Sequence, residues 1–337
     1  MQQPLEALKN LLQSEHRFLL VAHKSPDGDA VGSVAGMYYL LKNLGRKVEV
    51  VLPDPPAANI AGFLDGTDCL FYSSDSKAVT ARFAEADCLV CLDFNATSRV
   101  GDMHYLLADF QGAKVLIDHH TEPEDFAEVT ISEVSCSSTC QLIYQCFEGM
   151  NLLAALDQYA ARCLYLGITT DTGSFRFPSV TAKTHEIVAS LIRCGIEQWK
   201  IHQEVFDNNS LNQLQLRGFA ISEKLVLLSQ SSQGIPFGFI WLTRNELERF
   251  NYQSGDTEGL VNTILSIEGI KAGVLIQEKS DGIKMSFRSK DEVHVNQFAK
   301  KYFNGGGHVY AAGGFSPDSM DVTISRLLSL MYELFPR

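Results

Sequence analysis

The sequence predicts an α/β protein of two domains. We expect an N-terminal parallel sheet with helices on both faces, and a smaller α/β C-terminal domain across a cleft. The chain of 337 residues exceeds one average domain. Short apolar runs alternate with helical patterns through the first half, as in successive βαβ units. A second strand-rich region follows a long helical stretch, and this order indicates a separate C-terminal domain.

Strand and helix patterns alternate in the first half of the chain. Helices are predicted at residues 5–12 and 30–44. Strands are predicted, in chain order, at residues 17–22, 48–52, 88–92 and 114–117. Strands this apolar, separated by helices, are typical of a parallel sheet that is buried on both faces.

Polar side chains follow three of these strands. His23 follows the first strand, Asp93 the third, and Asp118-His119-His120 the fourth. In open parallel sheets, ligands bind outside the carboxyl ends of the strands. We therefore expect these side chains to gather at one edge of the N-terminal sheet.

The second half of the chain begins with helices and ends with strands. Helices are predicted at residues 138–149, at 153–168 and from 181 to about 223. Strands are predicted at residues 224–228, 237–242, 272–277 and 283–288. The predicted organisation is an N-terminal domain at 1–195, a helical linker at 196–223 and a C-terminal domain at 224–337.

The charge and the apolar patterns limit the classes of partner. A formal net charge of −12 argues against tight binding to long DNA or RNA, which needs clustered Lys and Arg. A very short nucleotide held by a few local cations remains compatible with this charge. No apolar run approaches the roughly 20 residues of a membrane span. The first residues lack the features of a secretory signal, so a cytoplasmic location is expected.

The eight cysteines do not form the dense pattern of a disulfide framework. Cys88 and Cys91 are spaced as a CxxC pair, which can bind zinc or act in redox chemistry. Their apolar neighbours favour a buried strand in which cysteine is a small hydrophobic residue. Cys136 and Cys140 have helical spacing, and we interpret them in the same way.

The segment 23–29 combines three potential metal ligands with turn residues. His23, Asp27 and Asp29 follow a predicted strand, and the turn between them can direct all three into a small volume. A turn in which Asp29 caps the following helix is the alternative.

The triplet Asp118-His119-His120 is a stronger indication of function. Two adjacent histidines after an aspartate at a strand end are rarely a packing solution. Imidazole nitrogens bind Mn²⁺, Fe²⁺ or Zn²⁺, and carboxylates favour harder ions. A carboxylate beside a histidine ligand often orients the ring.

Three further residues are ambiguous when taken alone. Asp93 can bridge two cations or simply end a strand. Arg99 can hold an anionic substrate or face solvent. Asp171 can be a fourth carboxylate ligand or a helix-terminal turn residue.

Their combination resolves part of this ambiguity. Four carboxylates and two histidines that converge would repel one another unless cations lay between them. Two divalent ions would remove this repulsion. They would also ionise a shared water near neutral pH, and the resulting hydroxide would attack phosphorus in line.

In chain order, these motifs resemble the DHH phosphoesterase superfamily. The matching segments are His23-x-x-x-Asp27-Gly28-Asp29, Asp93, Asp118-His119-His120 and Asp171-Thr172-Gly173. Residues 305–313, Gly-Gly-Gly-His-x-x-Ala-Ala-Gly, resemble the DHHA1 C-terminal domain of its second subfamily. The resemblance covers most of the chain. It implies a DHH catalytic, metal-binding domain at 1–195 and a DHHA1 substrate-binding domain at 224–337.

The resemblance also implies two metal ions, with Mn²⁺ preferred over Mg²⁺ because histidine ligands suit it better. The two implied ligand sets are His23, Asp27 and Asp93, and Asp29, Asp93, His119 and Asp171. Asp93 would therefore bridge the two ions. Asp118 is expected to orient the histidines and His120 to contact the substrate phosphate, so the predicted catalytic residues are Asp93, His120 and Asp118.

The predicted substrate contacts include residues of the C-terminal domain. The resemblance places Arg288 and His308 there, facing the metals and binding a phosphate or terminal nucleotide. The bare backbone of Gly305, Gly306 and Gly307 would let a phosphate approach the N–H groups closely. Taken alone, a loop that needs positive φ explains this glycine run as well. Arg99 and His120 complete the predicted substrate-binding set.

The implied activity is Mn²⁺-dependent hydrolysis of short nucleotide phosphoesters. Members of this two-domain size include oligoribonucleases that degrade RNA a few residues long (nanoRNA). Many also remove the 3′-phosphate of adenosine 3′,5′-bisphosphate, and some hydrolyse linear or cyclic diadenylate. The predicted partner is a short oligonucleotide or nucleotide, with no long duplex and no membrane, and a homodimer is left open.

Three alternatives are weighed against this prediction. Inorganic pyrophosphatases or exopolyphosphatases share the metal motifs, but the pyrophosphatases usually carry a C-terminal domain with a basic signature that is absent here. Processive single-strand DNA exonucleases carry a further oligonucleotide-binding domain, for which the chain has no room. A nucleotide-binding regulator without catalysis is disfavoured because every expected metal ligand is present.

Overall fold

The computed structural model describes residues 2–14, 16–228, 235–253 and 255–335. The chain forms two compact units, Met1–Asn208 and Asn209–Arg337. The division falls inside the segment 196–223, which the sequence predicted as a helical linker. Two helices of that segment belong to different units: α9 (Gln198–Phe206) to the first and α10 (Leu211–Glu223) to the second.

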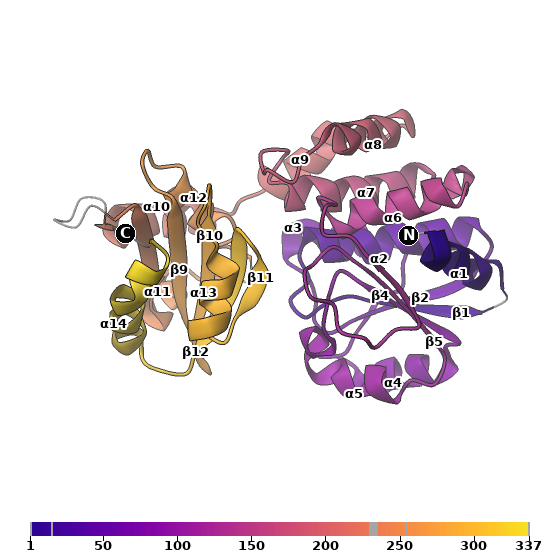
Figure 1. Cartoon of the computed structure of the whole chain (residues 1–337), viewed down its shortest axis with the longest axis horizontal. Coiled ribbons are helices and arrows are strands. Elements are labelled where there is room, and N and C mark those ends of the chain that lie inside the picture. The colour runs from indigo at the N-terminus through magenta and orange to yellow at the C-terminus, as the bar shows by residue number, and fades with distance from the viewer. Residues whose placement is uncertain (1, 15, 229–234, 254, 336–337) are drawn as a thin grey trace. The chain divides into compact units, whose positions relative to one another are not determined.

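A six-stranded parallel sheet forms the centre of the N-terminal unit, as predicted (Figure 1). The strand order is β3-β2-β1-β4-β5-β6. The strands are β1 (Arg17–Val21), β2 (Lys47–Leu52), β3 (Leu70–Phe71), β4 (Cys88–Leu92), β5 (Ala113–Asp118) and β6 (Val129–Ser132). The four predicted strands are confirmed. The two edge strands were not predicted, because β3 has only two residues and β6 alternates apolar and polar residues over only four positions.

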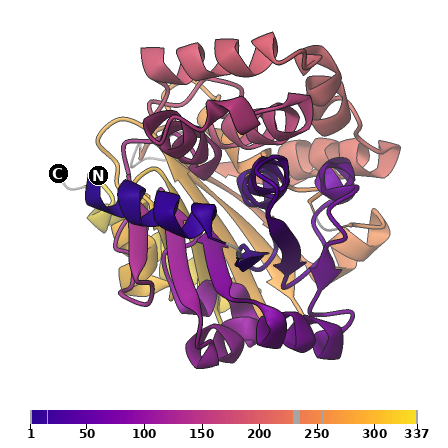
Figure 2. The same cartoon turned by 90° about the vertical axis from the view of Figure 1, so that its right-hand side faces the viewer.

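Helices cover both faces of this sheet (Figures 1 and 2). One apolar cluster joins α1, α2, α6 and α7 to one face, and a second joins α4 and α5 to the other. Neighbouring residues of β4 show the alternation, because Val90 lies in the first cluster and Leu89 in the second. The helices are α1 (Gln2–Gln13), α2 (Gly28–Asn43), α3 (Ala58–Ala61), α4 (Ser76–Glu85), α5 (His104–Asp109), α6 (Thr139–Gly149), α7 (Gln158–Asp171) and α8 (Ala182–Arg193), with short 3₁₀ helices at Gly62–Leu64, Thr97–Met103 and Leu153–Ala155.

Helices α2 and α7 approach each other at glycines of α2. A Cβ atom added to Gly28 would lie 2.4 Å from Oγ1 of Thr170, and one added to Gly32 would lie 2.5 Å from the carbonyl oxygen of Cys163. Later residues of α2 meet earlier residues of α7, so the two helices are antiparallel. The N-terminus of α2 therefore lies beside the C-terminus of α7, and each of these ends carries one of the predicted acidic ligands.

Replacement of Gly32 by alanine is expected to lower the free energy of unfolding by about 1–3 kcal/mol, because a backbone carbonyl cannot rotate away from the new methyl group. Thermal unfolding of Gly32→Ala measures this loss. Gly218→Ala is the matched control, because a Cβ added there, within α10, meets no atom within 4 Å. Alanine at position 218 should keep or raise stability. Equal melting temperatures for Gly32→Ala and wild type would contradict the close packing.

The C-terminal unit is a smaller α/β structure with a mixed six-stranded sheet in the order β11-β12-β10-β9-β8-β7. Strands β8 and β9 are parallel, and all other neighbours are antiparallel. Its strands are β7 (Leu225–Leu227), β8 (Phe237–Leu242), β9 (Ala272–Lys279), β10 (Gly282–Ser289), β11 (Gly306–His308) and β12 (Ala311–Ser316). The first four are confirmed predictions, whereas the glycine-rich β11 and β12 lack the apolar pattern that would predict them.

Helices also cover both faces of the second sheet. An apolar cluster joins α13 and α14 to one face, and another joins α10, α11 and α12 to the opposite face. The further helices of this unit are α11 (Arg244–Arg249), α12 (Leu260–Leu265), α13 (Val295–Tyr302) and α14 (Met320–Leu330), with a 3₁₀ helix at Met331–Glu333.

One predicted helix begins later than expected. The prediction of a helix from residue 153 is wrong in its first turn, because Leu153–Ala155 is a 3₁₀ helix. Helix α7 starts at Gln158, after Asp157, whose side chain accepts a hydrogen bond from the Ala160 amide at 2.8 Å. This cap starts the helix at the residue after Asp157 rather than in the preceding apolar run.

The CxxC pair is structural, as the sequence favoured. Cys88 and Cys91 are both buried and both free, and they belong to apolar clusters on opposite faces of β4. Two sulfurs on opposite faces of a strand cannot bind one ion. Burial raises the pKa of the Cys88 thiol to about 12, which suits an inert core residue.

Within the described ranges, no helix has the length and apolar character that a membrane crossing requires.

Candidate metal centre

The candidate site lies at the point where the strand order of the N-terminal sheet reverses. Strands β1 and β4 are neighbours, and the chain continues outward from them in opposite directions. His23 follows β1, Asp93 directly follows β4, and Asp118 is the last residue of β5. Such reversal points are where open α/β sheets bind ligands, outside the carboxyl ends of the strands.

A first group of side chains forms around His23. Its Nε2 atom lies 3.8 Å from Oδ2 of Asp27 and 3.6 Å from Oδ2 of Asp93. Its Nδ1 atom is 2.9 Å from the carbonyl oxygen of Lys24, which directs the ring. Burial alone would lower the pKa of His23, but the two neighbouring carboxylates outweigh burial and raise it to about 10.

A second group forms where the ends of α2 and α7 meet β5. Nε2 of His119 lies 3.3 Å from Oδ2 of Asp171, the last residue of α7, and 3.8 Å from Oδ2 of Asp29, in the first turn of α2. Nδ1 of His119 is 3.2 Å from the carbonyl oxygen of Cys136. This contact favours a proton on Nδ1 and leaves Nε2 to face the acids.

Asp93 stands between the two groups. Its Oδ2 atom faces His23, and its Oδ1 atom lies 3.7 Å from Nε2 of His119. The side chain is buried, and burial together with the nearby Asp29 charge raises its pKa well above the ordinary range. Its backbone has a positive φ of 65°, a conformation that Asp and Asn adopt more readily than most residues.

Asp118 fixes the position of His120. Oδ1 of Asp118 lies 2.7 Å from Nδ1 of His120, and Oδ2 accepts a hydrogen bond from the His120 amide at 3.1 Å. Asp118 is completely buried, so its carboxylate is shielded from competing water. Burial lowers the pKa of His120 despite the adjacent carboxylate, and the nearby charge of Arg99 contributes in the same direction.

The donor atoms of this site fit divalent cations. Among the described residues of the N-terminal unit, three groups offer ligand atoms that lie within 4.8 Å of one another: His23, Asp27 and Asp93; Asp29, His119 and Asp171; and Asp93, Asp118 and His120. Buried carboxylates at this spacing repel one another unless positive charge lies between them. Nε2 of His23 is buried and has no hydrogen-bond partner among the described residues, which is expected of a metal ligand. Mixed imidazole and carboxylate donors suit Mn²⁺, Fe²⁺ or Zn²⁺.

The start of α6 also belongs to this site, and the sequence did not indicate it. The amides of Thr139 and Cys140 donate to the two carboxylate oxygens of Asp29, at 2.6 and 3.0 Å. The hydroxyl of Thr139 donates to Oδ1 of Asp93 at 2.8 Å. The run Ser137-Ser138-Thr139 is a recognisable helix-start signal, but such a signal does not show which distant carboxylates the segment contacts.

The register of the C-terminal sheet aligns two predicted substrate contacts. Arg288 of β10 and His308 of β11 both lie opposite Ala311 of the intervening strand β12. Directly opposite residues of antiparallel strands point to the same face. Phe287 and Ala312 belong to the cluster under α13 and α14, so by alternation Arg288 and His308 point to the other face.

The glycine run has different roles at its three positions. A Cβ atom on Gly305 would lie 2.0 Å from the Gly313 carbonyl oxygen, and one on Gly307 would lie 2.5 Å from that of Ala311. These two glycines therefore allow β11 to lie close to β12. A Cβ atom on Gly306 would meet nothing within 4 Å, so only this position has the open space that an approaching phosphate needs.

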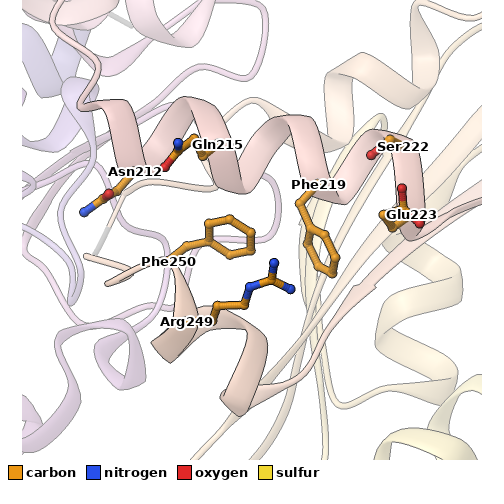
Figure 3. A pocket seen from close by; sticks show the side chains of 7 residues that line it. All are labelled: Asn212, Gln215, Phe219, Ser222, Glu223, Arg249 and Phe250. Carbon is orange, nitrogen blue, oxygen red and sulfur yellow. The ribbon is translucent and has the colours of Figure 1, made fainter.

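A pocket of about 730 Å³ lies elsewhere in the C-terminal unit, between α10 and the end of α11 (Figure 3). The guanidinium group of Arg249 lies 5.5 Å from the ring centre of Phe219 and 5.2 Å from that of Phe250. None of the predicted substrate contacts lines this pocket.

Comparison with protein families finds two matches along the chain. Residues 17–168 match the model of the DHH family N-terminal domain, and residues 240–334 match that of the DHHA1 domain. The first match includes the segments from His23 to His120, and the second includes Arg288 and the glycine run.

Curated relatives match over nearly the whole chain. The bifunctional oligoribonuclease and PAP phosphatase NrnA of Bacillus subtilis is 30% identical over 319 residues, which cover 94% of this chain and 95% of that protein. The cyclic-di-AMP phosphodiesterase PdeA of Listeria monocytogenes is 25% identical over 330 residues, which cover 95% of this chain and 47% of that protein.

A solved structure has the same fold over both units. The crystal structure of an exopolyphosphatase-related protein from Bacteroides fragilis has a TM-score of 0.91 and 31% sequence identity to this chain. The match covers 99% of this chain and 96% of that one.

Proposed function

Because this chain belongs to the DHH family, with an N-terminal DHH domain and a C-terminal DHHA1 domain, we propose that it binds two divalent cations, preferably Mn²⁺, and hydrolyses short nucleotide phosphoesters. The chain is a phosphoesterase, a hydrolase that acts on phosphate ester bonds. What we propose beyond this is that the chain binds two cations, that it prefers Mn²⁺, and that its esters are those of short nucleotides.

One observation carries this proposal: carboxylates and imidazoles, of which His23, Asp29, Asp93 and His119 are buried, have ligand atoms that face one another at the reversal point of the sheet. A purely structural histidine would hydrogen-bond through both ring nitrogens, yet Nε2 of His23 is buried without a hydrogen bond among the described residues. The proposed ligands of one ion are His23, Asp27 and Asp93; those of the other are Asp29, Asp93, His119 and Asp171.

Two divalent ions held there would ionise a water near neutral pH and offset the negative charge that develops on the phosphoryl oxygens. The protein residues would orient the reactants. Asp118 holds the ring of His120 through Nδ1, which would fix the orientation in which His120 meets a substrate phosphate. Arg99, whose charge acts on His120, would bind the same anion.

The proposed substrates are short oligoribonucleotides, adenosine 3′,5′-bisphosphate, and linear or cyclic diadenylate. The oligoribonuclease and PAP phosphatase activities of the Bacillus relative and the cyclic-di-AMP phosphodiesterase activity of the Listeria relative support this choice. The net charge of −12 supports a short ligand held by local cations rather than a long polyanion. Arg288, His308 and the backbone at Gly306 are the proposed contacts to its phosphate or terminal nucleotide.

A substrate panel tests this proposal. Purified protein with Mn²⁺ is incubated with dinucleotide RNA, adenosine 3′,5′-bisphosphate, linear and cyclic diadenylate, and pyrophosphate, and products are separated by chromatography. We expect hydrolysis of at least one nucleotide ester, and complete loss of activity after chelation that is restored by added Mn²⁺. Exclusive hydrolysis of pyrophosphate, or nucleotide turnover that survives chelation, would refute the proposal.

A further inference from the structure

Thr139 contacts the carboxylate that the two proposed cation groups share and a carboxylate that belongs to only one of them. Its hydroxyl donates to Oδ1 of Asp93 at 2.8 Å, and its amide donates to Oδ2 of Asp29 at 2.6 Å. Thr139 is completely buried, and both carboxylates are 1% exposed, so water does not compete for these bonds. A single residue therefore links the two halves of the proposed centre.

The hydroxyl of Thr139 is not needed to cap its own helix. Ser138 is the residue that caps α6, because its side chain accepts the amide of Gln141 at 3.0 Å. Thr139 follows as the first helical residue, and its amide is one of those that have no partner within the helix. The threonine side chain is thus free from local capping and reaches Asp93, 46 positions earlier in the chain.

The contact suits a carboxylate that binds cations. A carboxylate has about four acceptor positions, so one hydrogen bond from a hydroxyl leaves Oδ2 and part of Oδ1 for metal. The branched side chain of threonine restricts χ1, which keeps the hydroxyl directed at its partner. At Asp29, each carboxylate oxygen accepts an amide from the start of α6, so these two bonds fix the orientation of the carboxylate.

We propose that Thr139 is a positioning residue for the hydrolytic reaction, which holds Asp93 and Asp29 at the separation that the two cations require. This inference rests on the proposed function. The hydroxyl sets the orientation of Asp93, and the amide, together with that of Cys140, sets the orientation of Asp29. Neither group needs to touch the substrate.

Thr139→Val separates the two contacts, because it removes the hydroxyl and keeps the amide. Partners that orient metal ligands typically contribute 10- to 100-fold in affinity or activity. We therefore expect Mn²⁺ affinity and kcat to fall by about 10- to 100-fold, with KM close to that of wild type. Mn²⁺ affinity is measured without substrate, from the electron paramagnetic resonance signal of free Mn²⁺ during titration.

Thr139→Ser and Thr139→Ala provide a second comparison if the valine variant does not fold. Both lose the methyl group, and they differ only in the hydroxyl. The serine variant should bind Mn²⁺ nearly as well as wild type, and the alanine variant should resemble Thr139→Val. Equal Mn²⁺ affinity of the serine and alanine variants would overturn the inference, as would wild-type affinity in Thr139→Val.

Thr184→Val is the matched control for the loss of a buried hydroxyl. Thr184 is also completely buried, and its hydroxyl donates to the neutral side chain of Gln141 at 2.9 Å. This variant should lose stability but keep Mn²⁺ affinity.

Mn²⁺ binding by Asp93→Asn shows whether a negative result refutes the role of Thr139 or the proposed cation site. If Asp93→Asn loses Mn²⁺ and Thr139→Val does not, only the role of Thr139 is wrong. If Asp93→Asn binds Mn²⁺ as wild type does, the cation site itself is wrong.

Discussion

Asp93→Asn is expected to abolish Mn²⁺-dependent hydrolysis, with kcat reduced by at least about 10³-fold, or about 4 kcal/mol of transition-state stabilisation. One oxygen of Asp93 faces His23 and the other faces His119, so this carboxylate is the element that both proposed cations share. An amide replaces one anionic oxygen with an N–H donor, which a cation repels. Initial rates with the best substrate of the panel measure the effect.

The fold should survive this substitution. Asparagine tolerates the positive φ of 65° at position 93, and its carbonyl oxygen can still accept the hydroxyl of Thr139. Loss of the Asp93 charge removes repulsion with Asp29 and attraction to His23, so thermal stability in metal-free buffer should stay close to that of wild type. Persistent turnover of short RNA in a folded Asp93→Asn protein would rule out the bridging role.

Arg288→Ala and His308→Ala should each lower kcat/KM for nucleotide substrates by about 10- to 100-fold, the value of one charged hydrogen bond to phosphate. The two side chains lie on the same face of the C-terminal sheet, on either side of Ala311, whose small size leaves space between them. Neither is a proposed metal ligand, so Mn²⁺ affinity should not change. Steady-state kinetics and Mn²⁺ titration of the same preparations measure the two effects.

Arg326→Ala is the control for these variants. Arg326 lies in α14 of the same unit, where it pairs with Asp318 at 3.9 Å and covers the ring of Phe303. Its loss should leave kcat/KM near that of wild type. Loss of Mn²⁺ from His308→Ala, or equal kinetic losses in all three variants, would contradict the assignment of Arg288 and His308 to substrate binding.

The sequence predicted most of the N-terminal fold because its central strands are continuous apolar runs with polar residues at their ends. That placement also predicted where the candidate ligands gather, since the carboxyl ends of parallel strands share an edge. The strand order, which makes β1 and β4 neighbours, is a tertiary property. It brings His23 and Asp93 within 3.6 Å although 70 positions separate them.

Other features depend on contacts that no local pattern encodes. Ser137-Ser138-Thr139 indicates a helix start, but the partners of Thr139 lie 46 and 110 positions away. Gly32 lies within a predicted helix, and only the packing of α2 against α7 explains why glycine is needed there. Strands β11 and β12 contain glycines that allow close strand contact, so they lack the apolar alternation by which strands are predicted.

The number of Mn²⁺ ions bound per chain tests the central claim most directly. The protein is stripped with chelator, dialysed against Mn²⁺ at low micromolar concentration and analysed for metal and protein content, in parallel with Asp93→Asn. The proposed centre predicts two ions per wild-type chain and a clear loss of bound metal in the variant. Fewer than two ions in active wild-type protein, or unchanged binding in Asp93→Asn, would contradict a two-cation site bridged by Asp93.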